Sequence, residues 1–311
     1  MESLAAADPV VTVDAGDSLA HVAPLPEELR GAAEARARLL LAAMARTRIA
    51  AVAVGERDLA LGADWLVREA QAAGVPLLAA NLRAADGARP FAPHRIVEAG
   101  GARIGILAVT GSSARPEGLT VDDPGDAAKA AAAALRAQGA TLVVALLHMG
   151  RDEARALAAG GLPADVAIVA HDGRRLEPEL VGSVLLAAPN DRGRDVFALA
   201  IDLSSRGRWA DLGAPRRAEE ERQAVERWIA IGKDRLTRAT ALADRRALED
   251  FLSIQTERLT DAVRRSKLTP EGRLFELRIL TLGPEAPEDP ALAPEVERVT
   301  ARYGAPPGAE E

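Results

Sequence analysis

Residues 10–19 read VVTVDAGDSL, and the fold is decided by this stretch. An apolar, β-branched run leads into Asp14 and Asp17, which are separated by Ala15 and Gly16. Such a run predicts a buried strand, and the glycine allows a sharp turn directly after it. In open α/β sheets, ligands bind at the carboxyl ends of the strands. Asp17 is therefore a candidate metal ligand, and a solvated Asx turn is the alternative interpretation.

Predicted strands and helices alternate along the chain after this stretch. Helices are predicted at residues 27–46, 64–73 (with Gly74 as its C-terminal cap) and 126–138 (with Asp126 as its N-terminal cap). Strands are predicted at residues 49–54, 75–80, 93–98, 103–109, 141–147 and 165–169, followed by a closing strand pair at 184–187 and 196–203. Residues 112–125 are expected to be a loop. This order predicts an α/β fold with layered sheets.

The last third of the chain has a different character. Residues 216–267 are rich in Ala, Arg, Glu and Leu, with apolar side chains such as Val225 at helical spacing. This pattern predicts two long amphipathic helices, arranged as an antiparallel pair. Residues 274–282 are a short helix or strand, and the Pro-, Glu- and Ala-rich tail is expected to be loosely ordered. We therefore expect a domain at 1–213, a helical extension at 214–283 and a tail at 284–311.

Composition excludes several classes of function. The chain has 311 residues, 48% of them hydrophobic, and a formal net charge of −7. It contains no cysteine, which excludes disulfides, thiolate metal sites and cysteine nucleophiles. No basic patch with interleaved aromatic residues is present, so no nucleic-acid partner is expected. No apolar run reaches the length of a membrane span, and the first residues lack the pattern of a signal peptide.

Polar side chains follow four of the predicted strands. They are Asp17, then Glu56 with Arg57, then His148, then His171. A single histidine at a strand end is usually structural, but several acids and histidines at successive strand ends can converge on one rim. We therefore expect Asp17, Glu56, His148 and His171 to share one coordination sphere. Three further residues are expected to line this site: Asp14, Asn81 and Asp172.

Six segments, in this order, resemble the 5′-nucleotidase branch of the calcineurin-like metallophosphatases. Within residues 10–203 they read VDAGDSL, AVGERDLALGADWL, PLLAANLRAADGARPFAPHRIVEAGGARIGILAVTG, LLHMG, DVAIVAHDG and APNDRGRDVFALAIDL. The resemblance implies a four-layer αββα sandwich with a metal centre that hydrolyses phosphate esters. It also implies a phosphate-containing small molecule as ligand, and a periplasmic or exported bacterial protein.

The sequence departs from the family pattern at several positions. The family's first strand carries D-x-H, and residues 1–9, MESLAAADP, contain no such motif, so we expect this sequence to begin after the position of that strand. Glu56 and Arg57 stand where the family's GNHE motif has Asn and His, and the family's His contacts the phosphate. Gly173 stands where the family has the last His of H-S-H.

Sorted by metal ion, these departures are not random. In the family, one ion is held by D-x-H, the bridging Asp and the last His, of which Asp17 alone is left. The other ion's positions read Asp17, Glu56, His148 and His171, and these side chains can all bind a divalent ion such as Zn, Mn or Fe. The resemblance therefore implies at most one metal site, or none.

Three functions follow from these observations. The family's mechanism uses two ions to clamp the attacking and leaving oxygens, so loss of one ion predicts a catalytically impaired protein with a binding or structural role. The first alternative is an active phosphoesterase whose first metal motif lies outside this chain. The second alternative is a module that binds a protein partner through its C-terminal helices.

Arg57 separates two versions of the first hypothesis. An arginine cannot donate a proton to a leaving group as a histidine can. It can instead neutralise Asp14 or Asp17, which would make the site a salt-bridged relic, and we favour this version because buried acids need a counter-charge. Alternatively, it can hold a phosphate-like anion beside one remaining ion.

Overall fold

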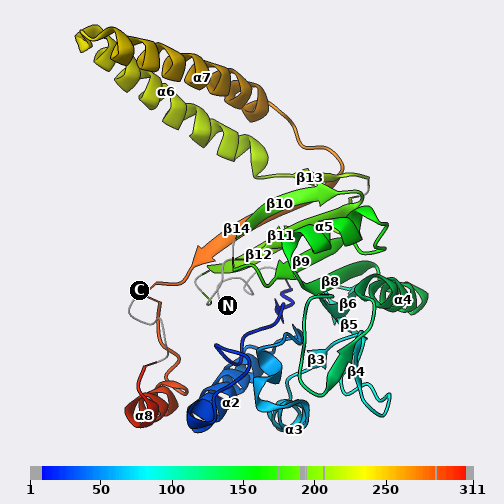
Figure 1. Cartoon of the computed structure of the whole chain (residues 1–311). Coiled ribbons are helices and arrows are strands. Elements are labelled where there is room, and N and C mark those ends of the chain that lie inside the picture. The colour runs from blue at the N-terminus through cyan, green and yellow to red at the C-terminus, as the bar shows by residue number, and fades with distance from the viewer. Residues whose placement is uncertain are drawn as a thin grey trace. The chain divides into compact units, whose positions relative to one another are not determined.

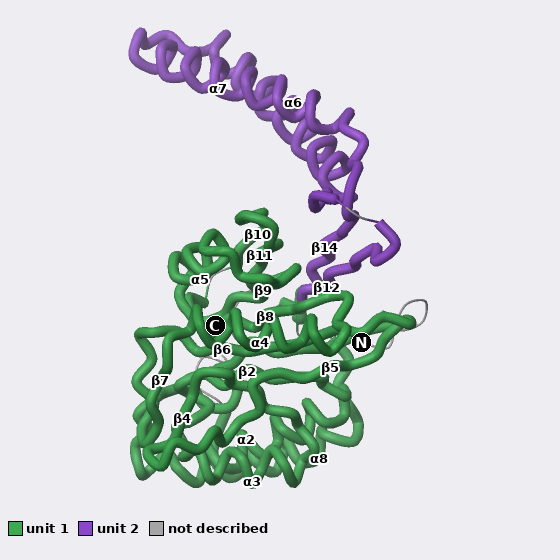
Figure 2. The backbone as a smooth tube through the Cα atoms, turned by 90° about the vertical axis from the view of Figure 1, so that its right-hand side faces the viewer, with its two compact units in different colours: residues 1–196, 280–311 green, residues 197–279 purple. Residues whose placement is uncertain are grey.

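The computed structural model describes residues 9–173, 175–189, 193, 195–205, 207–283 and 286–305. It divides into two units, which Figure 2 shows in green and purple. The first unit consists of residues 1–196 and 280–311, and the second of residues 197–279. All the candidate site residues belong to the first unit. The segment limits expected near residues 213 and 283 stay predictions.

A small parallel sheet carries the first two strand ends. Its strands, in the order β1-β2-β3, are β1 (Val13–Asp14), β2 (Ala51–Ala53) and β3 (Leu77–Leu78). The short helices η1 (Glu27–Leu29) and η2 (Asp58–Leu61) precede α2 (Arg30–Arg46) and α3 (Ala63–Ala73). Both α-helices bury apolar side chains in one core with the small sheet.

A larger mixed sheet carries the two histidines. Its order is β10-β11-β9-β8-β6-β5. The bounds are β5 (His94–Ala99), β6 (Ala102–Thr110), β8 (Leu142–His148), β9 (Val166–Ala170), β10 (Leu176–Val181) and β11 (Val184–Ala188). The inner strands are parallel, and β5 and β10 are antiparallel edge strands. Helices α4 (Pro124–Ala137) and α5 (Arg151–Ala159) contribute buried side chains to the core of this sheet.

The two sheets lie against each other between the two pairs of helices (Figure 1). The hydroxyl of Thr110, at the end of β6, donates to the carbonyl of Val54, just after β2, at 2.8 Å. The amide of Ala80 donates to the carbonyl of Ala108 on β6 at 2.8 Å. Because each sheet has helices on its outer face, the fold is a four-layer αββα sandwich, and the predicted fold class is confirmed.

Several local predictions were inaccurate. The cap of α4 is Asp123 instead of Asp126, because Pro124 occupies the first turn and Asp123 accepts the amide of Asp126 at 2.8 Å. The expected loop at 112–125 contains β7 (Leu119–Val121), which pairs with β4 (Leu82–Ala84). Gly74 does cap α3, in the left-handed conformation.

The expected pairing of the strands near residues 184–187 and 196–203 was wrong. Strand β11 pairs with β10 and β9, whereas β12 (Asp195–Ile201) pairs with β14 (Arg273–Thr281). Strand β10 ends just before β11 begins in the sequence, and it occupies the place beside β11 in the sheet. Most of the turn PNDRGRD lies outside the described residues.

The second unit contains the predicted helix pair, α6 (Ala214–Arg238) and α7 (Leu242–Ser266). Gly232 allows the two helices to approach closely, since a Cβ there would lie 2.9 Å from Leu252. Strand β13 (Trp209–Asp211) pairs with β14, so the segment at 274–282 is a strand instead of a helix. No helix in the described residues is both long enough and apolar enough to cross a membrane.

The tail is more ordered than expected, because residues 293–303 form helix α8 (Ala293–Tyr303). Arg46 of α2 makes a bidentate contact with Asp289 at 2.9 and 3.1 Å. Arg36 donates to the carbonyls of Tyr303 and Gly304 at the end of α8, at 3.3 and 3.1 Å. A cation at a helix C-terminus satisfies carbonyls that have no partner within the helix. The composition of the tail is typical of disorder, but contacts with α2 stabilise a helix there.

Candidate metal centre

Two histidines reach the same edge of the large sheet because they end neighbouring parallel strands. His148 is the last residue of β8, and His171 follows β9 directly. In the register of these strands His148 is paired with Ala170. The two imidazole rings lie 5.5 Å apart between centroids and are inclined by 56°. His171 has a φ of 139°, a strained backbone conformation of the kind found at functional positions.

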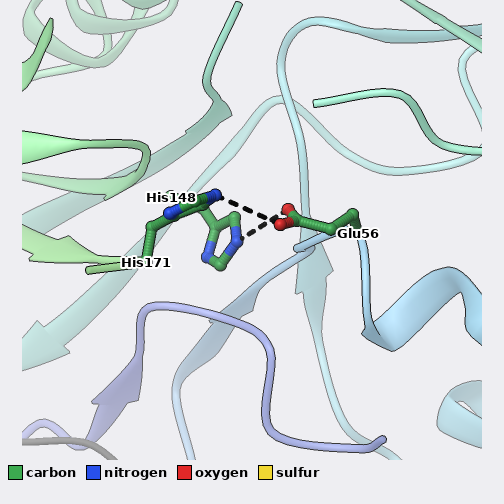
Figure 3. A group of neighbouring side chains, drawn as sticks. All are labelled: Glu56, His148 and His171. Atoms are coloured by element: carbon green, nitrogen blue, oxygen red, sulfur yellow. Dashed lines mark hydrogen bonds and ion pairs between the residues drawn. The ribbon is translucent and has the colours of Figure 1, made fainter. Parts of the chain in front are cut away.

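Glu56 bridges the two histidines from the small sheet (Figure 3). One of its carboxylate oxygens lies 3.1 Å from Nε2 of His148, and the other lies 3.2 Å from Nε2 of His171. One ligand atom from each of these three residues lies within 4.8 Å of the others. The structure therefore brings together three of the four residues predicted as metal ligands in one compact group.

His148 is held with one ring nitrogen pointing into this group. Its Nδ1 lies 3.0 Å from the carbonyl of Ala15, an arrangement in which Nδ1–H donates and Nε2 is left for a ligand. A backbone carbonyl on the second ring nitrogen is a common feature of metal-binding histidines, because it fixes the tautomer and the ring orientation.

Without an ion, His148 and Glu56 form an ion pair. Burial alone would lower the pKa of His148, but the carboxylates of Asp17 and Glu56 outweigh burial and raise this pKa to about 10. The hydrogen bond from His148 lowers the pKa of Glu56 to about 2. The proton on His148 thus occupies the position that a cation would take.

Asp17, the fourth predicted ligand, lies beside the group. Its Oδ2 is 3.4 Å from Nε2 of His148 and 3.4 Å from Nε of Arg57. Its Oδ1 accepts the backbone N–H of Arg57 at 2.8 Å. A Cβ on Gly55 would lie 2.2 Å from this Oδ1 and 2.7 Å from the ring of His148, so only glycine fits there. These two contacts pair Arg57, whose side chain is exposed, with Asp17.

Two other predicted site residues, Asp14 and Asn81, form hydrogen bonds mainly with backbone groups. Asp14 accepts the amide of Gly16 and the hydroxyl of Ser18, both at 2.8 Å, and burial raises its pKa. Asn81 is fully buried and exchanges hydrogen bonds with the backbone of Thr110 at 2.7 and 2.9 Å. Both side chains stabilise strand ends near the centre.

Asp172 contacts the centre from outside. One of its carboxylate oxygens accepts the amide of Arg151, at the start of α5, at 2.8 Å. The other lies 3.6 Å from Nδ1 of His171, whereas Glu56 approaches Nε2 of the same ring. At 3.6 Å the two groups are close enough for an ion pair but not for a hydrogen bond, so Asp172 lies beside His171 without fixing its ring.

Asp58 was missed by the sequence analysis. Its carboxylate is 2% exposed, and burial raises its pKa to about 6. It accepts backbone N–H groups of Asp17, Leu19 and Gly55 at 2.8, 3.0 and 2.9 Å. The signal was present, because Asp58 directly follows Glu56 and Arg57 at the same strand end, but only those two were singled out.

The side chains present fit a divalent transition-metal ion. Two imidazole nitrogens and carboxylate oxygens are the ligands that zinc and neighbouring metals accept when no thiolate is available. The carbonyl behind His148 supplies the outer contact that such a ligand needs. Among the described residues, this is the one group of at least three acidic, histidine or cysteine side chains with metal-binding spacing.

No family model and no curated protein matches the chain. Solved structures do match. A 5′-nucleotidase precursor from Thermus thermophilus has a TM-score of 0.53 and 24% identity, over 65% of this chain and 44% of its own. The sulfate thiohydrolase SoxB of the same organism has a TM-score of 0.53 and 19% identity, over 62% of this chain and 36% of its own. A calcineurin-like phosphoesterase of Bacillus subtilis, YfkN, has a TM-score of 0.51 and 17% identity, over 61% of this chain and 70% of its own.

These likenesses define the fold. The chain has a metallophosphatase fold of the 5′-nucleotidase-like type, as its motifs indicated. It spans less than half the length of the first two matched structures.

Proposed function

We propose that this chain is a degenerate metallophosphatase-fold protein that holds one divalent ion, binds a phosphate-containing small molecule and hydrolyses phosphate esters poorly. The observation that carries the proposal is the bridge of Glu56 between His148 and His171, at 3.1 and 3.2 Å. An acid between two histidines matches the ligand set of a single ion. Asp17 is the fourth ligand in this proposal.

The ion's own contribution is that of a Lewis acid, which polarises a phosphoryl oxygen. Zn, Mn and Fe are the ions that this ligand set favours. The protein's contribution is to hold His148 in place through the carbonyl of Ala15 behind its ring.

Two substitutions support impaired hydrolysis. Arg57 stands where the resembling family has a histidine beside the phosphate, and an arginine does not act as a proton donor near neutral pH. Gly173 has no side chain to bind a second ion where the family has a histidine. With one ion, the transition state loses the paired clamp on the attacking and leaving oxygens.

In the metal-free protein Arg57 is paired with Asp17, which is the contact that the salt-bridged version expects. With an ion bound at the centre, we propose the other version, in which Arg57 contacts a bound anion. Its guanidinium is exposed and lies 3.4 Å from Asp17, a distance at which the pairing is weak. When an ion takes up the negative charge of Asp17, the guanidinium is available to a phosphate, which arginine binds with a two-pronged geometry.

The test combines metal content with hydrolysis. Purified protein is loaded with Zn²⁺, Mn²⁺ or Fe²⁺ and dialysed; its metal content is then measured beside its turnover of an aryl phosphate. One ion per chain, together with a turnover at least about a hundredfold below that of an intact nucleotidase, would support the proposal. Loss of general acid–base catalysis alone lowers a rate by about that factor. Robust metal-dependent hydrolysis of nucleotides would contradict it.

Matched variants locate the ion. Glu56→Ala and His171→Ala should abolish metal uptake. His94→Asn is the control, because His94 lies on the edge strand β5 and contacts Gln138 instead of the centre. If His94→Asn lost metal and His171→Ala kept it, the assignment of the centre would be wrong.

A second role, binding of a protein partner through α6 and α7, has one supporting observation. Trp228, Leu242 and Ile254 are large apolar side chains of this helix pair with exposed fractions of 54, 66 and 57%. If the partner is a second copy of the chain, the wild type should sediment as a dimer and Trp228→Glu as a monomer. A wild type that sediments as a monomer would argue against self-association there. We also propose a periplasmic or exported location, which the resemblance to the 5′-nucleotidase branch implies; cell fractionation tests it.

A further inference from the structure

Asp58 joins the two loops that present Asp17 and Glu56. Its buried carboxylate accepts backbone N–H groups from Asp17 at 2.8 Å and Leu19 at 3.0 Å, both in the first loop. It also accepts the N–H of Gly55, in its own loop, at 2.9 Å. Both carboxylate oxygens are thus used on the backbone, and Asp58 does not belong to the metal-binding group itself.

The bond to Asp17 holds a strained backbone. Asp17 has a φ of 62°, in the left-handed region that residues with a Cβ avoid. Such a conformation persists where surrounding contacts over-determine it. Here the amide of Asp17 is directed at Asp58, and in return Oδ1 of Asp17 accepts the amide of Arg57 at 2.8 Å.

This exchange of bonds decides which way the Asp17 carboxylate faces. Because Oδ1 is bonded to the neighbouring loop, Oδ2 is the oxygen that lies toward Nε2 of His148, at 3.4 Å. A rotation of the Asp17 backbone into an ordinary conformation would break the bond to Asp58 and turn the carboxylate away from His148.

We propose that Asp58 is a positioning residue, whose bonds to the amides of Asp17 and Leu19 keep the Asp17 carboxylate in the metal centre. The inference rests on the proposed function, since it assumes an ion at that centre. Asp58 acts through Asp17 and does not touch the ion.

The test measures Zn²⁺ affinity of the full chain by competition with a chromophoric chelator. Asp58→Ala should weaken Zn²⁺ binding by about 10- to 100-fold, the usual effect of removing an outer partner of a metal ligand. Asp58→Asn keeps one acceptor oxygen and should have an intermediate affinity. Asp123→Ala is the control: it removes the N-terminal cap of α4, another aspartate bonded to a backbone amide, and should leave the affinity unchanged.

A double-mutant comparison separates positioning from general stability. If Asp58 acts through Asp17, then Asp58→Ala should weaken Zn²⁺ binding far less in an Asp17→Ala background than in the wild type. An equal loss in both backgrounds, or no loss in the wild type, would overturn the inference.

Amide hydrogen exchange separates this inference from the proposed function. If the wild type takes up no Zn²⁺, the proposed function fails. Amide exchange in the metal-free protein then tests separately whether Asp58 holds the loop of Asp17 in place. Faster exchange at Asp17 and Leu19 in Asp58→Asn than in Asp123→Ala would support the inference, and unchanged exchange would overturn it. If Asp58→Ala does not fold, Asp58→Asn carries every comparison.

Discussion

His148 and Glu56 form an ion pair at the strand edge, with 3.1 Å between Nε2 of the imidazole and a carboxylate oxygen. The ring is buried, whereas the carboxylate is partly exposed. A buried cation between acids stabilises the fold only while it keeps its charge. In the metal-free protein this charge is a proton, and a metal ion would have to replace it.

The first prediction concerns the stability of the metal-free protein. The pKa of His148 in the folded state is about 10, above its ordinary 6.5. Its contribution is therefore complete below pH 6.5 and is lost as the pH rises toward 10. We expect the free energy of unfolding, measured with urea and a chelator, to fall over this range in the wild type but not in His148→Gln. Parallel pH profiles of the two proteins would contradict this prediction.

The acid side of the same ion pair gives the second prediction. The pKa of Glu56 is lowered from 4.5 to about 2, so its contribution is present above pH 4.5 and is lost as the pH falls toward 2. Glu56→Gln should therefore lose less stability than the wild type between these pH values. Because both shifts arise from one contact, the double variant with His148→Gln should be little less stable than either single variant. Additive losses would show that the two residues act separately.

Proton release on metal binding is the third prediction. Since the pKa of His148 is about 10, the ion must displace one proton at neutral pH. Zn²⁺ affinity should therefore rise about tenfold per pH unit near neutrality. Calorimetry in two buffers of different ionisation enthalpy measures the number of protons released. Release of none would contradict the proposed role of Nε2.

The fourth prediction concerns Gly55, where a Cβ would lie 2.2 Å from Asp17 and 2.7 Å from the ring of His148. Gly55→Ala should lower the free energy of unfolding by about 1–3 kcal/mol, as overpacking does, and should abolish Zn²⁺ uptake. Gly283→Ala is the control, because nothing lies within 4 Å of a Cβ there. If Gly55→Ala bound Zn²⁺ normally, the close approach would have no functional meaning.

The fifth prediction concerns Arg57. Restoring the family's residue with Arg57→His should not restore efficient hydrolysis, because Gly173 still offers no ligand for a second ion. Turnover of an aryl phosphate should stay at least about a hundredfold below that of an intact two-metal enzyme. A rise to ordinary nucleotidase rates would mean that Arg57 alone had silenced the centre.

The sequence predicted the inner strands well for a physical reason. Parallel strands covered on both faces read as unbroken apolar runs, as in residues 142–147 and 166–169. Side chains at the ends of neighbouring parallel strands share one edge, which is why His148 and His171 could be predicted as neighbours. Glu56 follows β2 of the small sheet, and it reaches the histidines because the two sheets lie against each other.

Elements at edges were harder to predict. Strand β10 reads LEPELV, and its Pro178 weakens the strand signal, as is usual for edge strands. Helix α8 depends on contacts from Arg36 and Arg46, which lie far away in the sequence. The position of Asp58 at a strand end was visible in the sequence, but its role could not be predicted, because its partners Asp17 and Leu19 lie some forty residues away.

Crystals grown with Zn²⁺ and measured at the zinc absorption edge show directly whether one ion binds between Glu56, His148 and His171. We expect one anomalous peak per chain at this centre, about 2.0–2.1 Å from Nε2 of both histidines and about 2.0–2.2 Å from an oxygen of Glu56. Two peaks at this centre, or full Zn²⁺ loading with no peak there, would contradict this expectation.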